Sequence, residues 1–251
     1  MKLIRTFLSI GSLVILGISS LPAQQGRTAP LAASESITNL GPLLQRVNAL
    51  KSEFRQYHAC SCTCGCYEKD LDAEADRAIA FLRTRVAHRK SNERLAMVLD
   101  IDETTLSNWA EMDAANFEYN RREFDAWIES AQAPAIAGTL RLYRQARELG
   151  VAVFFLTGRP ESQRAATEAN LRLRGFDDWQ QIIMRSSGEK GETALVFKSG
   201  ERRKIRAAGF RIVLNVGDQW SDLRSDLRSD LGGAAQAEYS VKYPDPFYFI
   251  K

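Results

Sequence analysis

The sequence predicts an α/β fold in which helices cover both faces of a parallel sheet. From Leu95 onward, short apolar runs of strand length alternate with longer stretches that carry apolar residues at helical spacing. This alternation is typical of parallel strands joined by helical crossovers. Acidic or hydroxyl residues follow directly after several of the apolar runs. Because ligands of open α/β sheets bind at the carboxyl ends of the strands, these polar residues are candidates for chemistry.

The size and charge of the chain limit the classes of function that it can serve. With 251 residues it is long enough for one large domain or two small ones. Hydrophobic residues make up 45% and charged residues 26%, which is ordinary for a globular protein with a full core. The formal net charge is +3, and it falls to +1 without Lys2 and Arg5. So small a charge is not typical of nucleic-acid binding, and we expect no nucleic-acid polymer among the partners.

Residues 1–23 have the three parts of a secretory signal peptide. Two basic residues precede the apolar run Phe7–Ile18, and Ser20–Ala23 fits a cleavage site. A membrane anchor is the alternative, but the run is shorter than the about 20 residues that a span needs. No cysteine lies near the cleavage region, which disfavours a lipid anchor. We therefore expect an exported protein, periplasmic or secreted, without a stable membrane anchor, whose residues 24–39 form a flexible lead-in.

Residues 40–90 are expected to add two helices to the main domain, which spans residues 40–251. Leu40–Tyr57 and Leu71–Val86 both carry apolar residues at helical spacing. We expect two helices here that pack on the main domain. Neither contains a reactive grouping.

All 4 cysteines of the chain lie in one short run between these helices. In an exported protein such a run favours disulfides, for which three pairings are possible. Two alternatives stay open, namely thiolates that bind zinc or copper(I) with His58 nearby, and free or intermolecular thiols. Structural zinc sites normally draw their ligands from two separated pairs, which this run lacks. The residues concerned are Cys60, Cys62, Cys64 and Cys66.

The strands and the helices between them follow from the periodicity of the apolar residues. The expected strands are Leu95–Ile101, Val151–Leu156, Gln181–Met184 and Phe210–Val216. The expected helices are Gly138–Leu149, Glu161–Arg174 and Gly200–Ala208. Residues 107–133 interrupt the alternation, and an insertion there would overhang the strand ends as a small cap. Its aromatic residues, any one of which is more often core than substrate contact, are Trp109, Phe117, Tyr119, Phe124 and Trp127.

Asp100 and Asp102 end the first strand two residues apart, and hydroxyl residues follow them. Paired aspartates at one strand end repel each other, and a divalent cation or an ordered proton relieves that cost. One aspartate can then be a nucleophile that forms an aspartyl-phosphate, and the other an acid/base. The alternative is an acidic turn in which Asp102 or Thr104 caps a helix.

Two further stretches can contact a phosphate group. Thr157 and Gly158 end the second strand before a helix, where a hydroxyl and a backbone amide can hold a phosphate oxygen. Lys198 lies in a basic stretch at a loop-to-helix start, where a lysine can neutralise a nucleophile and a phosphoryl group. Lys204 is the other candidate for this role, and a solvated basic face is the alternative interpretation.

Asp218 and Asp222 follow the last expected strand and complete a set of carboxylates. Magnesium prefers oxygen ligands in octahedral geometry and keeps several waters, so two or three carboxylates suffice to hold it. Asp218 is the expected direct ligand, and Asp222 acts directly or through water. Capping of a short helix is the alternative for either residue.

These motifs, in this order, resemble those of the haloacid dehalogenase (HAD) superfamily of phosphotransfer enzymes. In detail they are similar to the subfamily IIIB acid phosphatases, which include secreted bacterial enzymes and plant vegetative storage proteins. The resemblance covers roughly residues 40–251. The stretches that carry it are Val98–Thr104, Phe154–Arg159, Asn215–Leu223 and Lys242–Ile250.

The resemblance implies an HAD-like Rossmannoid sheet with a small helical cap and an N-terminal helical extension. It implies that Asp100 is the nucleophile and a magnesium ligand. Asp102 would be the general acid/base and would bind Mg²⁺ through its backbone carbonyl. An acidic pH optimum is implied as well. The phosphate-binding residues would be Thr157, Gly158 and Lys198, the last in the family's Phe-Lys-Ser setting, and the metal site would be completed by Asp218 and Asp222.

Two stretches depart from the family pattern. The cysteine run falls where relatives usually carry a short Ser/Gly turn. The stretch Ser221–Leu231 repeats with a period of four residues, which places its leucines on one side of a helix. We interpret it as a short duplication that extends a loop or helix, in which only Asp222 has the motif's spacing from Asp218.

The sequence therefore predicts a secreted, magnesium-dependent acid phosphatase that hydrolyses small phosphomonoesters through an aspartyl-phosphate. Aromatic residues of the insertion, such as Trp109 and Tyr119, make 5′-nucleotides a hypothesis for the substrate, because aromatic rings can stack a base. A non-catalytic storage or binding protein on the same fold, and a phosphotransferase that passes phosphate to an alcohol, are the alternatives. The sequence does not indicate an oligomeric state.

Overall fold

The computed structural model describes residues 40–186, 192–224 and 239–248. In these residues five parallel strands form one sheet in the order β3-β2-β1-β4-β5. All four strands expected from the sequence are present, and β5 adds an edge strand that was not expected. The strands are β1 (Arg94–Leu99), β2 (Ala152–Pro160), β3 (Gln181–Arg185), β4 (Phe210–Gly217) and β5 (Tyr239–Lys242). The predicted α/β class is confirmed.

The central strand β1 explains why the sheet is covered on both faces. Its side chains alternate, and all but the first of its residues are buried. Leu95, Met97 and Leu99 belong to one core cluster, while Ala96 and Val98 belong to another on the opposite face. Helices α2 (Tyr67–Ala87) and α5 (Ala137–Glu148) supply buried residues to the first cluster, and α7 (Ala194–Ala207) supplies them to the second. Burial on both faces is why the strand is an unbroken apolar run.

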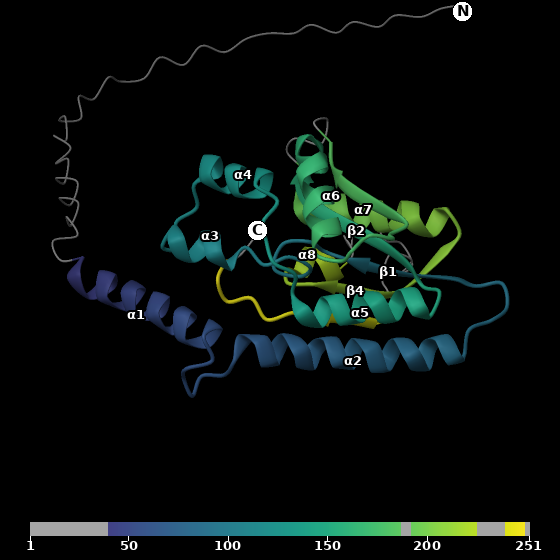
Figure 1. Ribbon diagram of the computed structural model, residues 1–251, viewed down its shortest axis with the longest axis horizontal. Helices are drawn as coiled ribbons and strands as arrows, with labels where there is room; N and C mark the ends of the chain where they lie inside the picture. Colours follow the sequence, from purple (N-terminus) through teal and green to yellow (C-terminus); the bar gives the residue numbers. More distant parts are fainter. Residues whose placement is uncertain (1–39, 187–191, 225–238, 249–251) are drawn as a thin grey trace, which may run out of the picture. The chain divides into compact units, whose positions relative to one another are not determined.

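Helices α2 and α5 lie side by side against the first face (Figure 1). The contact is close at Gly138, where a Cβ atom would lie 2.9 Å from the Cβ of Ala75. No side chain larger than hydrogen fits there without moving one helix, because real Cβ atoms do not approach so closely. The small residues of this contact therefore set how near α5 sits to α2.

Helix α1 (Gly41–His58) forms as expected but packs over only its C-terminal part. Phe54 and Tyr57 contact the core, whereas the apolar residues of the earlier turns are exposed. The expectation that α1 packs on the main domain therefore holds only for its C-terminal part, whereas α2 packs as expected. Helical spacing identifies an apolar face but not what covers it. The exposed residues are Leu43, Leu44, Val47 and Leu50.

The cysteine run between α1 and α2 forms two nested disulfides. Cys60 is bonded to Cys66, and Cys62 to Cys64. This agrees with the favoured interpretation and selects one of the three pairings. None of the four cysteines is left as a free thiol.

Several expected boundaries are wrong. Strand β1 ends at Leu99 and not at Ile101, and α2 begins at Tyr67 and not at Leu71. The second strand does not end at Leu156, because β2 continues irregularly through Thr157 and Gly158 to Pro160. Helix α7 begins at Ala194 and not at Gly200, because the Thr193 side chain caps it by accepting a hydrogen bond from the Val196 amide. Glycine near a helix start is a weak signal, and here it lies inside the helix.

The insertion between β1 and α5 contains α3 (Trp109–Ala114) and α4 (Arg121–Glu129). The remaining short elements are η1 (Glu161–Gln163), α6 (Arg164–Leu173) and α8 (Trp220–Leu223). No helix among the described residues is both long and apolar enough to cross a bilayer. The expected signal peptide, the lead-in at 24–39 and the part of the four-residue repeat that follows Arg224 lie outside the described residues.

Candidate active site

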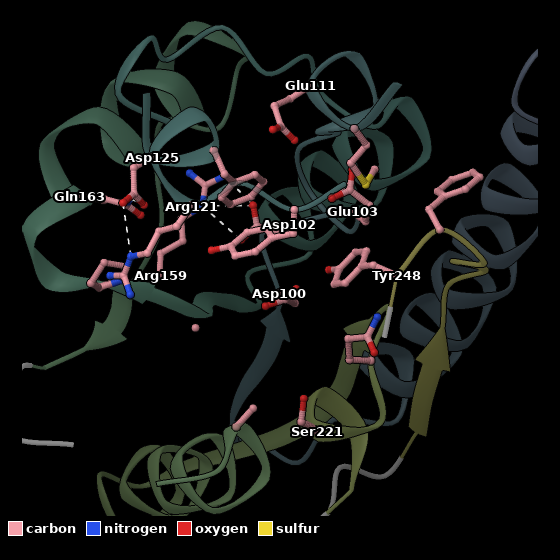
Figure 2. A pocket seen from close by; sticks show the side chains of 18 of the residues that line it. Asp100, Asp102, Glu103, Glu111, Arg121, Asp125, Arg159, Gln163, Ser221 and Tyr248 are labelled. Atoms are coloured by element: carbon pink, nitrogen blue, oxygen red, sulfur yellow. Dashed lines mark hydrogen bonds and ion pairs between the residues drawn. The ribbon is translucent and has the colours of Figure 1, made fainter. Parts of the chain in front are cut away.

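A cavity of about 690 Å³ lies between the carboxyl ends of the central strands and the insertion (Figure 2). Asp100, Asp102 and Lys198 line it from the sheet side. We call these residues, with Asp218 and Asp222, the floor, and the insertion helices α3 and α4 with their flanking loop the cap. The cap contributes Phe117, Tyr119 and Phe124 to the cavity wall, besides charged residues. The floor follows from the topology, because β1 and β4 are adjacent and end at the same edge.

Lys198 joins two carboxylates of the floor. It lies in the second turn of α7, not at a loop-to-helix start, and it is 5% exposed. Its amine is 2.6 Å from a carboxylate oxygen of Asp100 and also pairs with Asp222. Burial alone would lower the pKa of Lys198, but the two carboxylates outweigh it and raise the pKa, so the amine stays charged. Lys204, by contrast, is exposed and pairs with Glu201.

Asp100, Asp218 and Asp222 form a compact carboxylate cluster. One oxygen of each lies within 4.8 Å of the others, and all three residues are buried. Burial and the neighbouring carboxylates raise the pKa of Asp100 and of Asp218 well above the ordinary value. Like charges gathered in a buried site are what a hard divalent cation neutralises. The donor set, all oxygen, fits such a cation.

Local structure holds the two later aspartates in place. The Thr104 hydroxyl donates to Asp218 at 3.2 Å, and the Gln219 amide donates to Asp222 at 2.9 Å. Gly217 permits this turn, since a Cβ atom there would lie 2.2 Å from the Cβ of Asp222. The capping that the sequence suggested as an alternative for Asp222 is present at α8 together with its place in the cluster.

Asp102 stands apart from this cluster and has its own partners. The Arg159 guanidinium contacts its carboxylate at 2.6 Å, and the Asn108 side-chain amide donates to it at 2.8 Å. Burial would raise the pKa of Asp102, but Arg159 first and Asn108 second more than compensate and lower it. Asp102 is therefore a carboxylate in the resting site.

The structure places the two predicted phosphate-binding residues differently with respect to the cavity, and their role in phosphate binding stays a prediction. Gly158 lines the cavity with its neighbour Arg159. Thr157 is fully buried beneath them, and its hydroxyl oxygen accepts a hydrogen bond from the Arg159 amide at 3.1 Å. Thr157 thus shapes the turn that presents the other two residues.

The aromatic residues of the cap divide into two groups. Phe117, Tyr119 and Phe124 reach the cavity. Trp109 stacks on His58 with ring centroids 3.8 Å apart, and Trp127 donates its indole N–H to Asn108 at 2.9 Å. Trp109, one of the two residues that the sequence suggested for stacking a base, is therefore used for packing instead.

Comparison with known proteins identifies the family. The sequence profile of the HAD superfamily, subfamily IIIB (acid phosphatase), matches residues 24–251. The chain is 37% identical over 187 residues to "Acid phosphatase 1" of Solanum lycopersicum, which covers 73% of this chain and 69% of the tomato protein. The chain belongs to HAD subfamily IIIB.

Further relatives of this subfamily IIIB protein agree. "Stem 31 kDa glycoprotein" of Glycine max is 34% identical over 188 residues, or 74% of this chain and 70% of the soybean protein. The class C acid phosphatase from Bacillus anthracis has the same fold, with a TM-score of 0.62 and 20% identity over 81% of this chain and 87% of that one. The predicted family is confirmed, and the chain is a phosphomonoesterase of the acid phosphatase type.

Besides Arg159, three residues of this subfamily IIIB site have no role in the sequence-based prediction. Arg202, fully buried one turn after Lys198 on α7, donates to the backbone carbonyls of Ser221 and Asp222. Asp245 lies beside Gln219, whose side-chain amide contacts both Asp218 and Asp245. Burial raises the pKa of Asp245 to about 6. Asn108, which bonds Asp102, is the third. Of the three, only Arg202 could have been found from the sequence, because it lies four residues after Lys198 and therefore on the same side of the helix.

Proposed function

We propose that this protein is an exported, magnesium-dependent acid phosphatase whose nucleophile is Asp100. The observation that carries the proposal is the buried cluster of Asp100, Lys198 and two further aspartates beneath an open cavity. Asp100 and Lys198 both line the cavity, so a phosphate group that enters it can meet the carboxylate of Asp100 beside the amine of Lys198. Arg159 and Gly158 line the same cavity and can contact the phosphate oxygens.

In the first step an oxygen of Asp100 attacks phosphorus, and the bond from phosphorus to the alcohol oxygen breaks. The leaving oxygen takes a proton from Asp102. Since Asp102 is a carboxylate at rest, this proton arrives with the monoanionic form of the phosphate ester, whose second pKa is about 6. The requirement favours acidic pH, in line with the family.

In the second step a water oxygen attacks phosphorus and the bond between phosphorus and Asp100 breaks. Asp102 accepts one proton from the water and passes it to the phosphate, so inorganic phosphate leaves with both protons of the water and Asp102 returns to its resting carboxylate form. Lys198 keeps its positive charge beside Asp100 in both steps and offsets the charge that gathers on the phosphoryl group. Positioning and charge compensation of this kind supply most of the catalysis in phosphoryl transfer.

The residues that would hold Mg²⁺ are Asp100, Asp218 and Asp222 through their side chains and Asp102 through its backbone carbonyl. A bound Mg²⁺ ion would reduce the repulsion between the nucleophile and the negatively charged ester. The raised pKa values of Asp100 and Asp218 support a cation here, because burial first and the neighbouring carboxylates second disfavour their charged forms, and a bound cation would offset both.

For the substrate we propose a phosphomonoester whose alcohol part carries an aromatic or heteroaromatic ring, of which a 5′-nucleotide is one. The wall opposite the floor is built from Phe117, Tyr119 and Phe124, and ring faces of this kind stack on bases. For localisation we propose export to the periplasm or the medium. The two disulfides support this, since disulfides persist in oxidising compartments.

The test is phosphate release from phenyl phosphate by the purified protein with Mg²⁺, with a chelator, and with the Asp100→Asn variant. We expect activity with Mg²⁺ only, and a loss of at least about 10³-fold in the variant, since an amide cannot form the intermediate. Near-normal activity of Asp100→Asn in a folded protein would refute the assignment. Transfer to added alcohol in place of water would identify a phosphotransferase.

A further inference from the structure

Asn108 connects Asp102 to the cap. Its side-chain amide nitrogen donates to Asp102 and to Glu103, both at 2.8 Å, and its side-chain oxygen accepts the indole N–H of Trp127 on α4 at 2.9 Å. Asn108 is fully buried and comes from the loop between β1 and α3. Asp102 is thus reached from α4 through two consecutive hydrogen bonds.

The side chain of Asn108 bonds Asp102 in place of the helix that follows it. Asn108 occupies the N-cap of α3, where asparagine usually caps the helix with its side chain. Here the side chain makes no capping hydrogen bond and turns to the carboxylates instead. A capping hydrogen bond would stabilise the helix, and in this structure the hydrogen bond to Asp102 takes its place.

Arg159 holds the same carboxylate from the other side. Its guanidinium contacts both oxygens of Asp102, and its remaining nitrogen donates to the Thr167 hydroxyl on α6 at 3.1 Å. Arg159 belongs to β2 and is 4% exposed, so it is fixed to the sheet. The direction of the Asp102 carboxylate is therefore set by one partner on the sheet and one that leads to the cap.

Trp127 is remote from the reacting atoms. It lines a shallow surface pocket with Ala126 and Ser130, and it is absent from the wall of the catalytic cavity. Its path to the site among the described residues runs through Asn108.

We propose that Trp127 and Asn108 are positioning residues that direct the Asp102 carboxylate toward the leaving oxygen. The inference rests on the proposed role of Asp102 as the group that protonates that oxygen. It makes cap helix α4 part of the acid/base apparatus, in addition to forming a wall of the cavity. The expected consequence depends on the alcohol that leaves. A poor leaving group such as an alkoxide needs the proton from Asp102, whereas p-nitrophenolate leaves without it.

The experiment compares kcat/KM for ethyl phosphate and for p-nitrophenyl phosphate in wild type, Trp127→Phe and Asn108→Ala. The value of kcat/KM reports the step in which the alcohol leaves, which is the step that separates the two substrates. Trp127→Phe removes the N–H donor and keeps an aromatic ring. We expect it to lower kcat/KM for ethyl phosphate about three- to tenfold, the worth of one hydrogen bond, and for p-nitrophenyl phosphate less than twofold. Asn108→Ala should show a larger loss in the same direction.

Trp109→Phe is the matched control, because Trp109 lies on the same cap but stacks on His58. It should leave both kcat/KM values unchanged. Equal losses with both substrates, no loss with either, or the same pattern in Trp109→Phe would overturn the proposal. Trp127→Phe keeps the test valid if Asn108→Ala does not fold. Failure of wild type to hydrolyse either substrate would instead refute the proposed function.

Discussion

The floor and the cap of the cavity are held together by different kinds of interaction. On the floor, Asp100, Lys198 and Asp222 are each at most 6% exposed and contact one another directly. On the cap, Tyr119 is 76% exposed, and the neighbouring segments are held through packing, single hydrogen bonds and solvent-exposed ion pairs such as Arg55 with Asp113. The floor is therefore held together by buried ion pairs, and the removal of one charged side chain leaves another buried charge without its partner. The ion pairs of the cap lie at the surface, where the loss of one partner costs little. Apart from Trp127, which is connected to Asp102 through Asn108, we therefore expect cap variants to alter substrate preference more than chemistry.

The largest effect is expected at the buried lysine of the floor. Lys198→Met leaves the Asp100 and Asp222 carboxylates without their cation, and it removes the positive charge next to the nucleophile. We expect kcat/KM for phenyl phosphate to fall about 10²- to 10³-fold. Lys204→Met, a change of the same kind at an exposed position of the same helix, serves as the control and should stay within twofold. Similar losses in both variants would contradict the assignment.

The second effect concerns stability without metal. Because the pKa of Asp218 is raised, the folded state binds more protons than the unfolded state above about pH 4, and stability falls as pH rises toward the raised value. In chelator, Asp218→Asn should therefore unfold about 3 °C or more above wild type at pH 7, and less so at pH 4. Added Mg²⁺ should reverse the order at pH 7 by stabilising wild type. A variant that is less stable than wild type in chelator at pH 7 would show that the cluster is not strained by its own charge.

The sequence was a good guide to the floor for a physical reason. Parallel strands bring their carboxyl ends together, so polar residues after Leu99 and Gly217 had to meet. Lys198 was singled out by its local sequence setting, although the start of its helix was predicted six residues too late. The error did not matter for the floor, because the long lysine side chain reaches Asp100 at the end of β1. The positions of the floor residues therefore depend on the order and direction of the strands, and the pattern of apolar residues in the sequence predicts strands that alternate with helices in a parallel sheet.

The cap was predicted much less well. Nothing local distinguishes Trp109 from Trp127, since both are aromatic residues on short helices, yet one stacks on α1 and the other bonds to Asn108. Arg159 stood in a recognised motif, but its partner Asp102 lies 57 residues away. Likewise the sequence reveals that α1 has an apolar face, but it does not reveal that most of this face is exposed. These features depend on which helices meet in space.

The third prediction addresses how the floor is supported from behind. Arg202 binds the backbone carbonyls of Ser221 and Asp222, and lysine cannot replace its fork of donors. Arg202→Lys should raise the Mg²⁺ concentration for half-maximal activity about tenfold, with a smaller change in kcat at saturating Mg²⁺. Direct Mg²⁺ binding by calorimetry should weaken in parallel. Unchanged Mg²⁺ affinity in a folded variant would restrict Arg202 to a role in stability.

The smallest effect is expected on the cap. Tyr119→Ala removes an exposed ring from the cavity wall, and we expect KM for adenosine 5′-monophosphate to rise about three- to fivefold. Ethyl phosphate, which has no ring to stack, should be unaffected, and Tyr119→Phe should restore the wild-type values. Equal changes with both substrates would argue against stacking at this position.

The covalent intermediate at Asp100 is the central claim of this account, and chemical trapping tests it most directly. The protein is mixed with excess p-nitrophenyl phosphate and Mg²⁺, quenched with acid within milliseconds and treated with borohydride, which reduces an acyl phosphate to an alcohol. Peptide mass spectrometry should then find homoserine at position 100, and none in the absence of substrate or in a sample with chelator. Turnover of the substrate without any homoserine at this position would contradict the mechanism.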